Sequence, residues 1–179
     1  MTFSTIRPAL LADRAAAWQV LAHPGSAMAL AVEIPHSEIG TGALIEATLG
    51  RYPFLVAQAP AEGAVQGLAW ASAHRAGLGL RWSVDVHVHA LPGPGQAMIA
   101  ETLYKALIQA LAEEGFLALY VALPYGHDHD HPLHAALGFS PIGRPCGADL
   151  PTQAQAWCLT LNAGQYHRPP TLSLAWRGN

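Results

Sequence analysis

The strongest constraint on the fold is an unbroken alternation of apolar and polar residues from residue 80 to residue 90. The apolar positions are Leu80, Trp82, Val84, Val86, Val88 and Ala90. The polar positions between them are Arg81, Ser83, Asp85, His87 and His89. Because successive side chains of a strand point to opposite faces, this pattern predicts a β-strand with one apolar face and one row of ionisable groups.

A tight loop and a long helical pattern follow this strand. Residues 91–95 form the run Leu-Pro-Gly-Pro-Gly, and the helical pattern extends from Ala97 to Gly115. Gly115 suits the position just after the helix, and Glu101 and Lys105 are spaced as an i,i+4 ion pair. A strand, a tight loop and a helix N-terminus in this order present backbone N–H groups and a positive dipole end to an anion.

The rest of the chain alternates between further strand and helix patterns. The predicted strands cover residues 2–8, 54–58, 64–74, 116–123, 139–143 and 156–161, and the predicted helices cover residues 10–22, 37–50 and 132–137. Ser37 is the expected N-cap of its helix, and the nearly all-apolar run 116–123 is typical of a strand covered on both faces. Together these elements predict one α/β (α+β) layered domain over residues 1–162, followed by a tail or added edge strand over residues 163–179.

Composition excludes two classes of function. The chain has 179 residues, of which 51% are hydrophobic, but no apolar run reaches the roughly eighteen residues of a membrane span. The single lysine and the net charge of −3 leave no cluster of cations for a nucleic acid or an acidic membrane. The first five residues do not read as a secretory signal, so we expect a cytoplasmic protein, and the low charge favours a homodimer. Cys146 and Cys158 have no metal-binding spacing and are expected to be plain thiols.

Four short motifs, spread along residues 5–145 of the chain, are similar to motifs of a known superfamily. They are Ile6-Arg7-Pro8 with Ala12-Asp13, Arg51-Tyr52-Pro53-Phe54-Leu55-Val56-Ala57, Arg81-Trp82-Ser83-Val84-Asp85, and Leu133-His134-Ala135-Ala136-Leu137-Gly138-Phe139. In these motifs the chain resembles the GNAT acetyltransferase superfamily, and within it the phosphinothricin-acetyltransferase-like branch. The resemblance implies a central mixed, twisted sheet of about six or seven strands with helices on both faces. It also implies that acetyl-CoA is the co-substrate and lies where the strands 80–90 and 116–123 splay apart.

Two catalytic residues follow from the resemblance. Asp85 matches the acidic residue that deprotonates the amine, directly or through water, although the branch usually has the longer Glu there. His134 matches a position that is often Tyr in the superfamily and His in the branch, where it would orient the CoA sulfur or protonate the departing thiolate. The alternatives stay open: Asp85 is a structural strand residue paired with Arg81 or a nearby histidine, and His134 is a histidine on the helix surface.

The pyrophosphate loop is the most altered part of the resemblance. The superfamily motif is Gln or Arg, two residues, Gly, one residue, then Gly or Ala, and of the run from Gly95 to Ala100 only Ala100 fits. Met98 stands where the family has Gly, so weak acetyl-CoA binding is expected, and Gln96 is a candidate for the lost amide. The cofactor contacts implied by the resemblance are His87, Val88, His89, Gly95, Gln96, Ala97, Met98, Ile99, Ala100 and His127.

The acceptor end of the site is implied more loosely. The substrate-binding residues by resemblance are Arg75, Arg81, His74 and Glu33. An arginine there would pair with a substrate carboxylate, and its alternative is a structural salt bridge. Val32, His74 and Leu80 replace aromatic residues of the branch, so the expected acceptor is a small amine other than the best-known one of the family.

A histidine-rich segment offers a different function. Residues 127–131 read His-Asp-His-Asp-His, and with His87 and His89 they supply five imidazoles and two carboxylates for a zinc or nickel ion. The competing interpretation makes this segment a loop in which Asp130 caps the helix that Pro132 opens, and we predict no metal. Three functions therefore stand, in order: an N-acetyltransferase for a small amine, a GNAT-fold binding or dimeric interaction module that has lost catalysis, and a metal-binding protein.

Overall fold

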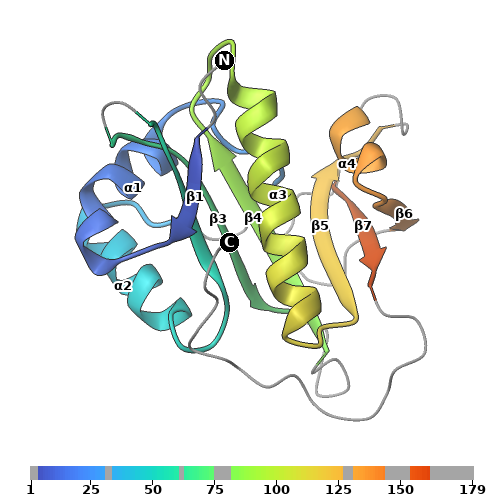
Figure 1. Cartoon of the computed structure of the whole chain (residues 1–179). Helices are drawn as coiled ribbons and strands as arrows, with labels where there is room; N and C mark the ends of the chain where they lie inside the picture. Colours follow the sequence, from blue (N-terminus) through green and yellow to red (C-terminus); the bar gives the residue numbers. More distant parts are fainter. Residues whose placement is uncertain are drawn as a thin grey trace.

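A single seven-stranded mixed sheet organises the protein, with strand order β1-β2-β3-β4-β5-β7-β6 in the computed structural model (Figure 1). The structure describes residues 4–30, 34–60, 63–74, 82–126, 131–143 and 154–161. The strands are β1 (Thr5–Pro8), β2 (Phe54–Gln58), β3 (Val65–Ala73), β4 (Ser83–Ala90), β5 (Ala118–Pro124), β6 (Ser140–Gly143) and β7 (Ala154–Thr160). The β4–β5 pair is parallel and the other neighbours are antiparallel. The predicted mixed sheet is confirmed.

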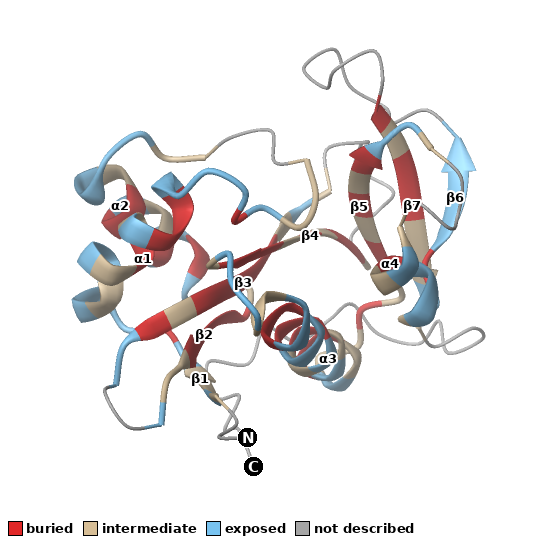
Figure 2. Ribbon diagram, turned by 90° about the horizontal axis from the view of Figure 1, so that it is seen from above, coloured by how far each residue is buried: buried red, intermediate tan, exposed pale blue. Residues whose placement is uncertain are grey.

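Helices cover both faces of the sheet, as predicted (Figure 2). They are α1 (Arg14–Ala22), α2 (Glu38–Thr48), α3 (Gln96–Glu113) and α4 (Pro132–Ala136), and a short 3₁₀ turn, η1 (Leu11–Asp13), precedes α1. That turn replaces the start of the predicted helix because the Asp13 carboxylate accepts the Leu10 N–H at 2.7 Å and pairs with Arg7 at 2.8 Å. No helix among the described residues is long and apolar enough to cross a membrane.

Several helix ends follow the sequence. The Ser37 hydroxyl accepts the Gly40 N–H at 3.1 Å and so caps α2, and Gly115 follows α3 with a left-handed φ of 91°. One predicted cap is wrong: His131, not Asp130, is the N-cap of α4, and its side chain makes no capping bond. Asp130 itself lies outside the described residues.

Helix α3 lies close against the sheet over Gly67. A Cβ atom at this position would meet Leu103 Cδ1 at 2.8 Å and the His89 carbonyl oxygen at 2.9 Å, so only glycine fits there. The apolar side of α3 then buries Leu103, Leu107 and Leu111 against the sheet. At about 1.5–3 kcal/mol for each fully buried leucine, this packing holds the helix against β3 and β4.

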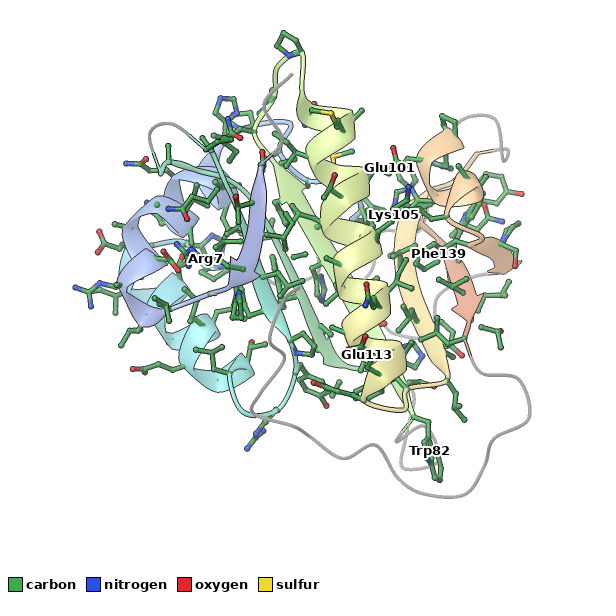
Figure 3. The ribbon with its side chains drawn as sticks, viewed as in Figure 1. Arg7, Trp82, Glu101, Lys105, Glu113 and Phe139 are labelled. Carbon is green, nitrogen blue, oxygen red and sulfur yellow. The ribbon has the colours of Figure 1, made fainter. Side chains whose placement is uncertain are left out.

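The alternation in β4 holds, but its polar face is not a solvated row. Val84, Val86, Val88 and Ala90 are buried in the α3 side of the core. On the other face His89 is only 1% exposed, because α1 and the loop after it cover that end of the strand. Trp82 precedes β4 and points away from the lower end of the sheet (Figure 3).

The expectation that the strand at 116–123 is covered on both faces is wrong. In β5 the residues Leu119, Val121 and Leu123 are buried, whereas Ala118, Tyr120 and Ala122 between them are half-buried. Helices α1 and α2 pack on β3 and α1 also reaches β4, and β5 lies beyond them. One face of β5 is therefore available to form part of a site.

Candidate active site

The two central strands separate where the resemblance expects acetyl-CoA to lie. Strands β4 and β5 pair only over Ser83↔Ala118, Val84↔Leu119 and Asp85↔Tyr120. Beyond that level β4 continues with β3, and β5 continues with β7 as far as Pro124. The two strands consequently diverge toward their carboxyl ends (Figure 1), and the backbone edges of Val86–Ala90 no longer face a paired neighbour in β5.

A segment after α1 crosses from one diverging strand to the other. Residues 26–30, here called the strap, bond to β4 through Met28 N–H to the Val88 carbonyl at 3.0 Å and through Ala90 N–H to the Ser26 carbonyl at 2.9 Å. The strap reaches β5 through Leu30 N–H to the Ala122 carbonyl at 2.7 Å. No sequence pattern signalled this bridge, because its contacts are made by main-chain atoms.

The strap also explains the state of His89. Its Nδ1 and the Ser26 hydroxyl share a hydrogen bond of 3.2 Å, and its ring stacks on Trp70 at 5.4 Å. Burial, followed by the nearby charge of His87, lowers the pKa of His89 to about 4. This residue is therefore neutral at pH 7 and its side chain is directed into the structure under the strap.

A row of polar side chains lies where β4 and β5 make their last pair. The register brings Ser72, Asp85, Tyr120 and Cys158 to one level across β3, β4, β5 and β7. His74 Nδ1 lies 2.7 Å from Asp85 Oδ1, and its ring stacks on Tyr120 at 4.0 Å. The predicted alternative partner of Asp85, a nearby histidine, is thus His74.

The other members of this row are neutral. The Ser72 hydroxyl and His87 Nε2 share a hydrogen bond of 3.0 Å, and the His87 ring stacks on Trp70 at 4.9 Å. Burial is the first cause that raises the pKa of Tyr120, and the interaction with Cys158 adds to it. Burial also raises the pKa of the Cys158 thiol. Asp85 and His74 are the two groups of the level suited to moving a proton.

The N-terminus of α3 offers main-chain donors. Its N-cap is Gly95, which has no side chain to bond the first turn, and the first N–H that finds a carbonyl within the turn is that of Ile99, to Gly95 at 3.0 Å. Ala97 and Met98 are exposed, and N–H groups at their positions have no intrahelical acceptor. Such an uncapped end suits the phosphates of a nucleotide.

The side chains around this turn form hydrogen bonds within the protein, are buried, or lie at the surface. Gln96 donates from Nε2 to the Gly25 carbonyl at 2.7 Å and to the Ala90 carbonyl at 3.0 Å, so its amide N–H groups hold the loop together. Ile99 and Ala100 are buried, and the Ile99 N–H is already bonded to the Gly95 carbonyl. Met98 is 39% exposed and stands at the surface of the turn.

His134 is a buried residue, so the alternative of a surface histidine is wrong. It is 3% exposed, its Nε2 shares a hydrogen bond of 2.8 Å with the Tyr104 hydroxyl, and its ring meets Phe139 edge-on at 6.0 Å. Burial, followed by the charge of His131, lowers its pKa to about 4. The hydrogen bond between Tyr104 and His134 links α3 to α4, and Figure 3 labels Phe139 beside α3 and below α4.

Some predicted site residues lie outside the described part of the chain. These are Glu33, Arg75, Arg81 and His127. Most of the histidine-rich segment lies there as well, and within the described ranges no group of three or more His, Cys, Asp or Glu side chains is placed to hold a metal ion. Sequence reasoning missed Tyr120, Ser72 and the strap. The one available signal was Tyr120 itself, a polar ring in an otherwise apolar strand.

Comparisons with known proteins find sequence relatives of the chain. No family model matches the chain. A phosphinothricin N-acetyltransferase of Streptomyces viridochromogenes is 30% identical over 142 residues, which cover 77% of this chain and 75% of that protein. A second one, from Streptomyces coelicolor, is 32% identical over 94 residues, which cover 52% of this chain and 55% of that protein.

Solved structures extend the similarity to the fold. A GNAT superfamily phosphinothricin acetyltransferase from Sinorhizobium meliloti, in complex with acetyl-CoA, superposes with a TM-score of 0.73 and 25% identity over 94% of both chains. A putative acetyltransferase from Salmonella typhimurium, solved with acetyl-CoA, has a TM-score of 0.71 at 24% identity, covering 95% of this chain and 99% of that one. The second of these shows the shared architecture alone.

Proposed function

The chain belongs to the phosphinothricin N-acetyltransferase branch of the GNAT acetyltransferases, and from that premise we propose that it acetylates the primary amine of a small molecule. It is an acyltransferase whose donor substrate is acetyl-CoA. Transfer from a thioester to an amine requires that the donor is held, that the amine loses a proton and that the thiolate leaves.

One observation carries the proposal: a titratable pair lies where the central strands part. Asp85 is in the last β4–β5 pair, at the inner end of the divergence, and it bonds His74. A donor lying between the diverging strands would bring its reactive end to this level. The pair formed by Asp85 and His74 is therefore assigned to deprotonation of the amine.

The other end of the donor is assigned to the start of α3. The free N–H groups of Ala97 and Met98, with the positive end of an 18-residue helix behind them, suit a pyrophosphate. This arrangement needs no arginine or glutamine side chain. It supports the view that the altered loop still binds acetyl-CoA through its main chain.

His134 is assigned to the region of the CoA sulfur. Its low pKa makes it a neutral hydrogen-bonding group at pH 7 rather than a strong acid. The bond to Tyr104 fixes the ring, since Tyr104 is fully buried in α3. Orientation of the sulfur is thus better supported than protonation of the thiolate.

The acceptor is tested by measuring thiol release from acetyl-CoA in the presence of primary amines. The panel contains amino acids, amino-acid analogues that include phosphinothricin, alkyl amines and a peptide with a free N-terminus. We expect turnover above acceptor-free hydrolysis with at least one small amine, and a reduced rate of this turnover in Asp85→Asn. Turnover restricted to the peptide, or to no amine at all, contradicts the proposed acceptor class.

Homodimerisation and a cytoplasmic location complete the proposal. Large apolar side chains are exposed, among them Ile39 at 85%, Tyr125 at 76% and Ile142 at 56%, and a second copy could cover part of this surface. The free, half-buried thiol of Cys158 suits a reducing compartment. Sedimentation equilibrium tests the dimer, and cell fractionation tests the location.

A further inference from the structure

We propose that His74, rather than Asp85, takes the proton from the acceptor amine, and that Asp85 acts as the residue that positions it. The inference rests on the proposed function, since it concerns the same acetyl transfer. It is carried by the geometry of one pair of side chains at the level where β4 leaves β5: His74 directly follows β3, and Asp85 lies on the neighbouring strand β4.

The hydrogen bond between the two groups decides which atom is open to a substrate. His74 Nδ1 and Asp85 Oδ1 are 2.7 Å apart, a short bond of the kind that forms when one partner is charged. Because an ionised carboxylate can only accept, the proton of this bond belongs to Nδ1. Nε2 then carries the lone pair, and it has no hydrogen-bond partner among the described residues.

The ring is also held in its plane. It stacks on Tyr120 with 4.0 Å between the ring centres and 13° between the planes. The carboxylate on one edge and the phenol ring on one face restrict rotation about both side-chain bonds of His74. An imidazole with a fixed tautomer and a fixed orientation is the arrangement in which a buried aspartate prepares a histidine to act as a base.

Asp85 is less suited to meet the amine itself. One of its oxygens is engaged by His74, and its short side chain keeps the carboxylate close to the backbone of β4. Protonation of His74 would instead turn the pair into an imidazolium–carboxylate ion pair, which the negative charge stabilises. Both side chains keep some solvent contact, 17% for His74 and 30% for Asp85, so the proton can pass on to water.

The acceptor ammonium gives one proton to His74 Nε2 and becomes a neutral amine. The nitrogen lone pair forms the new C–N bond to the acetyl carbonyl carbon, the C–S bond breaks, and its electron pair leaves with sulfur. A second proton of the amine goes to sulfur to give the free thiol, and His74 returns its proton to water.

The pH dependence of this step is set by the groups around the ring. Asp85 faces it from β4 and Tyr120 faces it from β5, with Cys158 of β7 behind Tyr120. Tyr120 and Cys158 both have raised pKa values and stay uncharged near neutral pH. Of these described neighbours, Asp85 is the one that bonds the imidazole directly.

The test compares His74→Asn with Asp85→Asn, using acetyl-CoA and the amine that gives the largest kcat/KM in the panel above. An asparagine side chain can still donate to Asp85 but cannot titrate. We expect His74→Asn to lose about 100-fold or more in kcat at pH 7 with an unchanged KM for acetyl-CoA, and to lose the acid limb of its pH–rate profile. Asp85→Asn should keep an acid limb, shifted to lower pH because the imidazolium has lost its anion.

Three controls make the result decisive. His36→Asn, an exposed histidine outside the site, should match the wild type in rate and profile. His74→Ala should recover activity when free imidazole is added, whereas a merely misfolded variant would not. Titration calorimetry with acetyl-CoA should show unchanged binding in both His74 variants.

Two outcomes overturn the inference alone. One is a His74→Asn enzyme that keeps the wild-type acid limb. The other is an Asp85→Asn enzyme that loses the limb entirely, which would make Asp85 the base. A wild-type protein that acetylates no amine at all overturns the proposed function first, and the inference with it, so the two failures are told apart.

Discussion

At the scale of the residue, Glu114 is a carboxylate in an unfavourable place. It is the C-cap of α3, where the helix dipole is negative, and its Oε2 is buried without a hydrogen-bond partner among the described residues. Burial raises its pKa to about 7. Because the pKa is higher in the folded protein than in the unfolded chain, this group favours folding fully below about pH 4.5, and the contribution is lost as the pH rises through 7.

Replacement of the Glu114 carboxylate should therefore change the unfolding free energy only at high pH. We expect Glu114→Gln to raise the unfolding free energy at pH 8 by about 1 kcal/mol, a value discounted because the group is partly solvated, and to leave it unchanged at pH 5. Glu113→Gln is the matched control, since Glu113 is exposed and bonds Gln109 at 2.9 Å. Thermal unfolding at both pH values measures the effect, and an equal gain at both would contradict it.

The sequence identified single residues better than their surroundings. Asp85 and His134 came from matched motifs, and the alternation in 80–90 put Asp85 on the polar face. Alternation tells which face a side chain is on but not what covers that face. The burial of His89 and the partner of His134, Tyr104, depend on segments far away in the chain, and no local pattern contained them.

At the scale of the element, the N-terminus of α3 raises a steric question. Its N–H groups suit a pyrophosphate, but the Met98 side chain lies on the same turn where the family has glycine. A side chain at this point limits how near a phosphate can come to the main chain. The affinity for acetyl-CoA should therefore be low in the natural protein and should respond to the size of this residue.

Met98→Gly should bind acetyl-CoA three- to tenfold more tightly, which corresponds to about 0.7–1.4 kcal/mol. The substitution should also cost about 1 kcal/mol of folding stability, because glycine is a poor helix residue. Thr102→Gly, one turn further along the same exposed side, is the control: it should lose similar stability and gain no affinity. Equal titration-calorimetry affinities for the wild type and Met98→Gly would mean that the pyrophosphate binds elsewhere.

Element types were predicted well, and their ends and covered faces less well. The long helix, its Gly115 stop and the strand before it are set by local periodicity and capping. Periodicity and capping could not predict the position of the strap, because main-chain hydrogen bonds hold it. Any residue except proline can donate such a bond. The divergence of β4 and β5 was expected from the family resemblance and not from periodicity.

At the scale of the whole molecule, two buried neutral histidines make the free energy of unfolding depend on pH. His89 joins β4 to the strap under α1, and His134 joins α4 to α3 on the opposite face. Each has a pKa of about 4 in the folded protein, against 6.5 in the absence of the fold. The unfolded chain therefore binds protons at these sites between pH 6.5 and 4 while the folded protein does not, so acid favours unfolding in that window.

These two histidines should lower the unfolding free energy steadily from pH 6.5 to pH 4, by on the order of 3 kcal/mol each. Urea unfolding at closely spaced pH values measures this slope. His134→Gln should be less stable than the wild type at pH 7.5 because it loses the packing of the ring, but its slope should be shallower, whereas His36→Gln, at an exposed position, should change neither. The Arg7–Asp13 pair, in which the hydrogen bond to Arg7 is the largest cause lowering the pKa of Asp13, adds its own loss only below about pH 4. A fall confined to that lower range would mean that the histidines stay solvated, and both sides of the site would then be more open than their packing indicates.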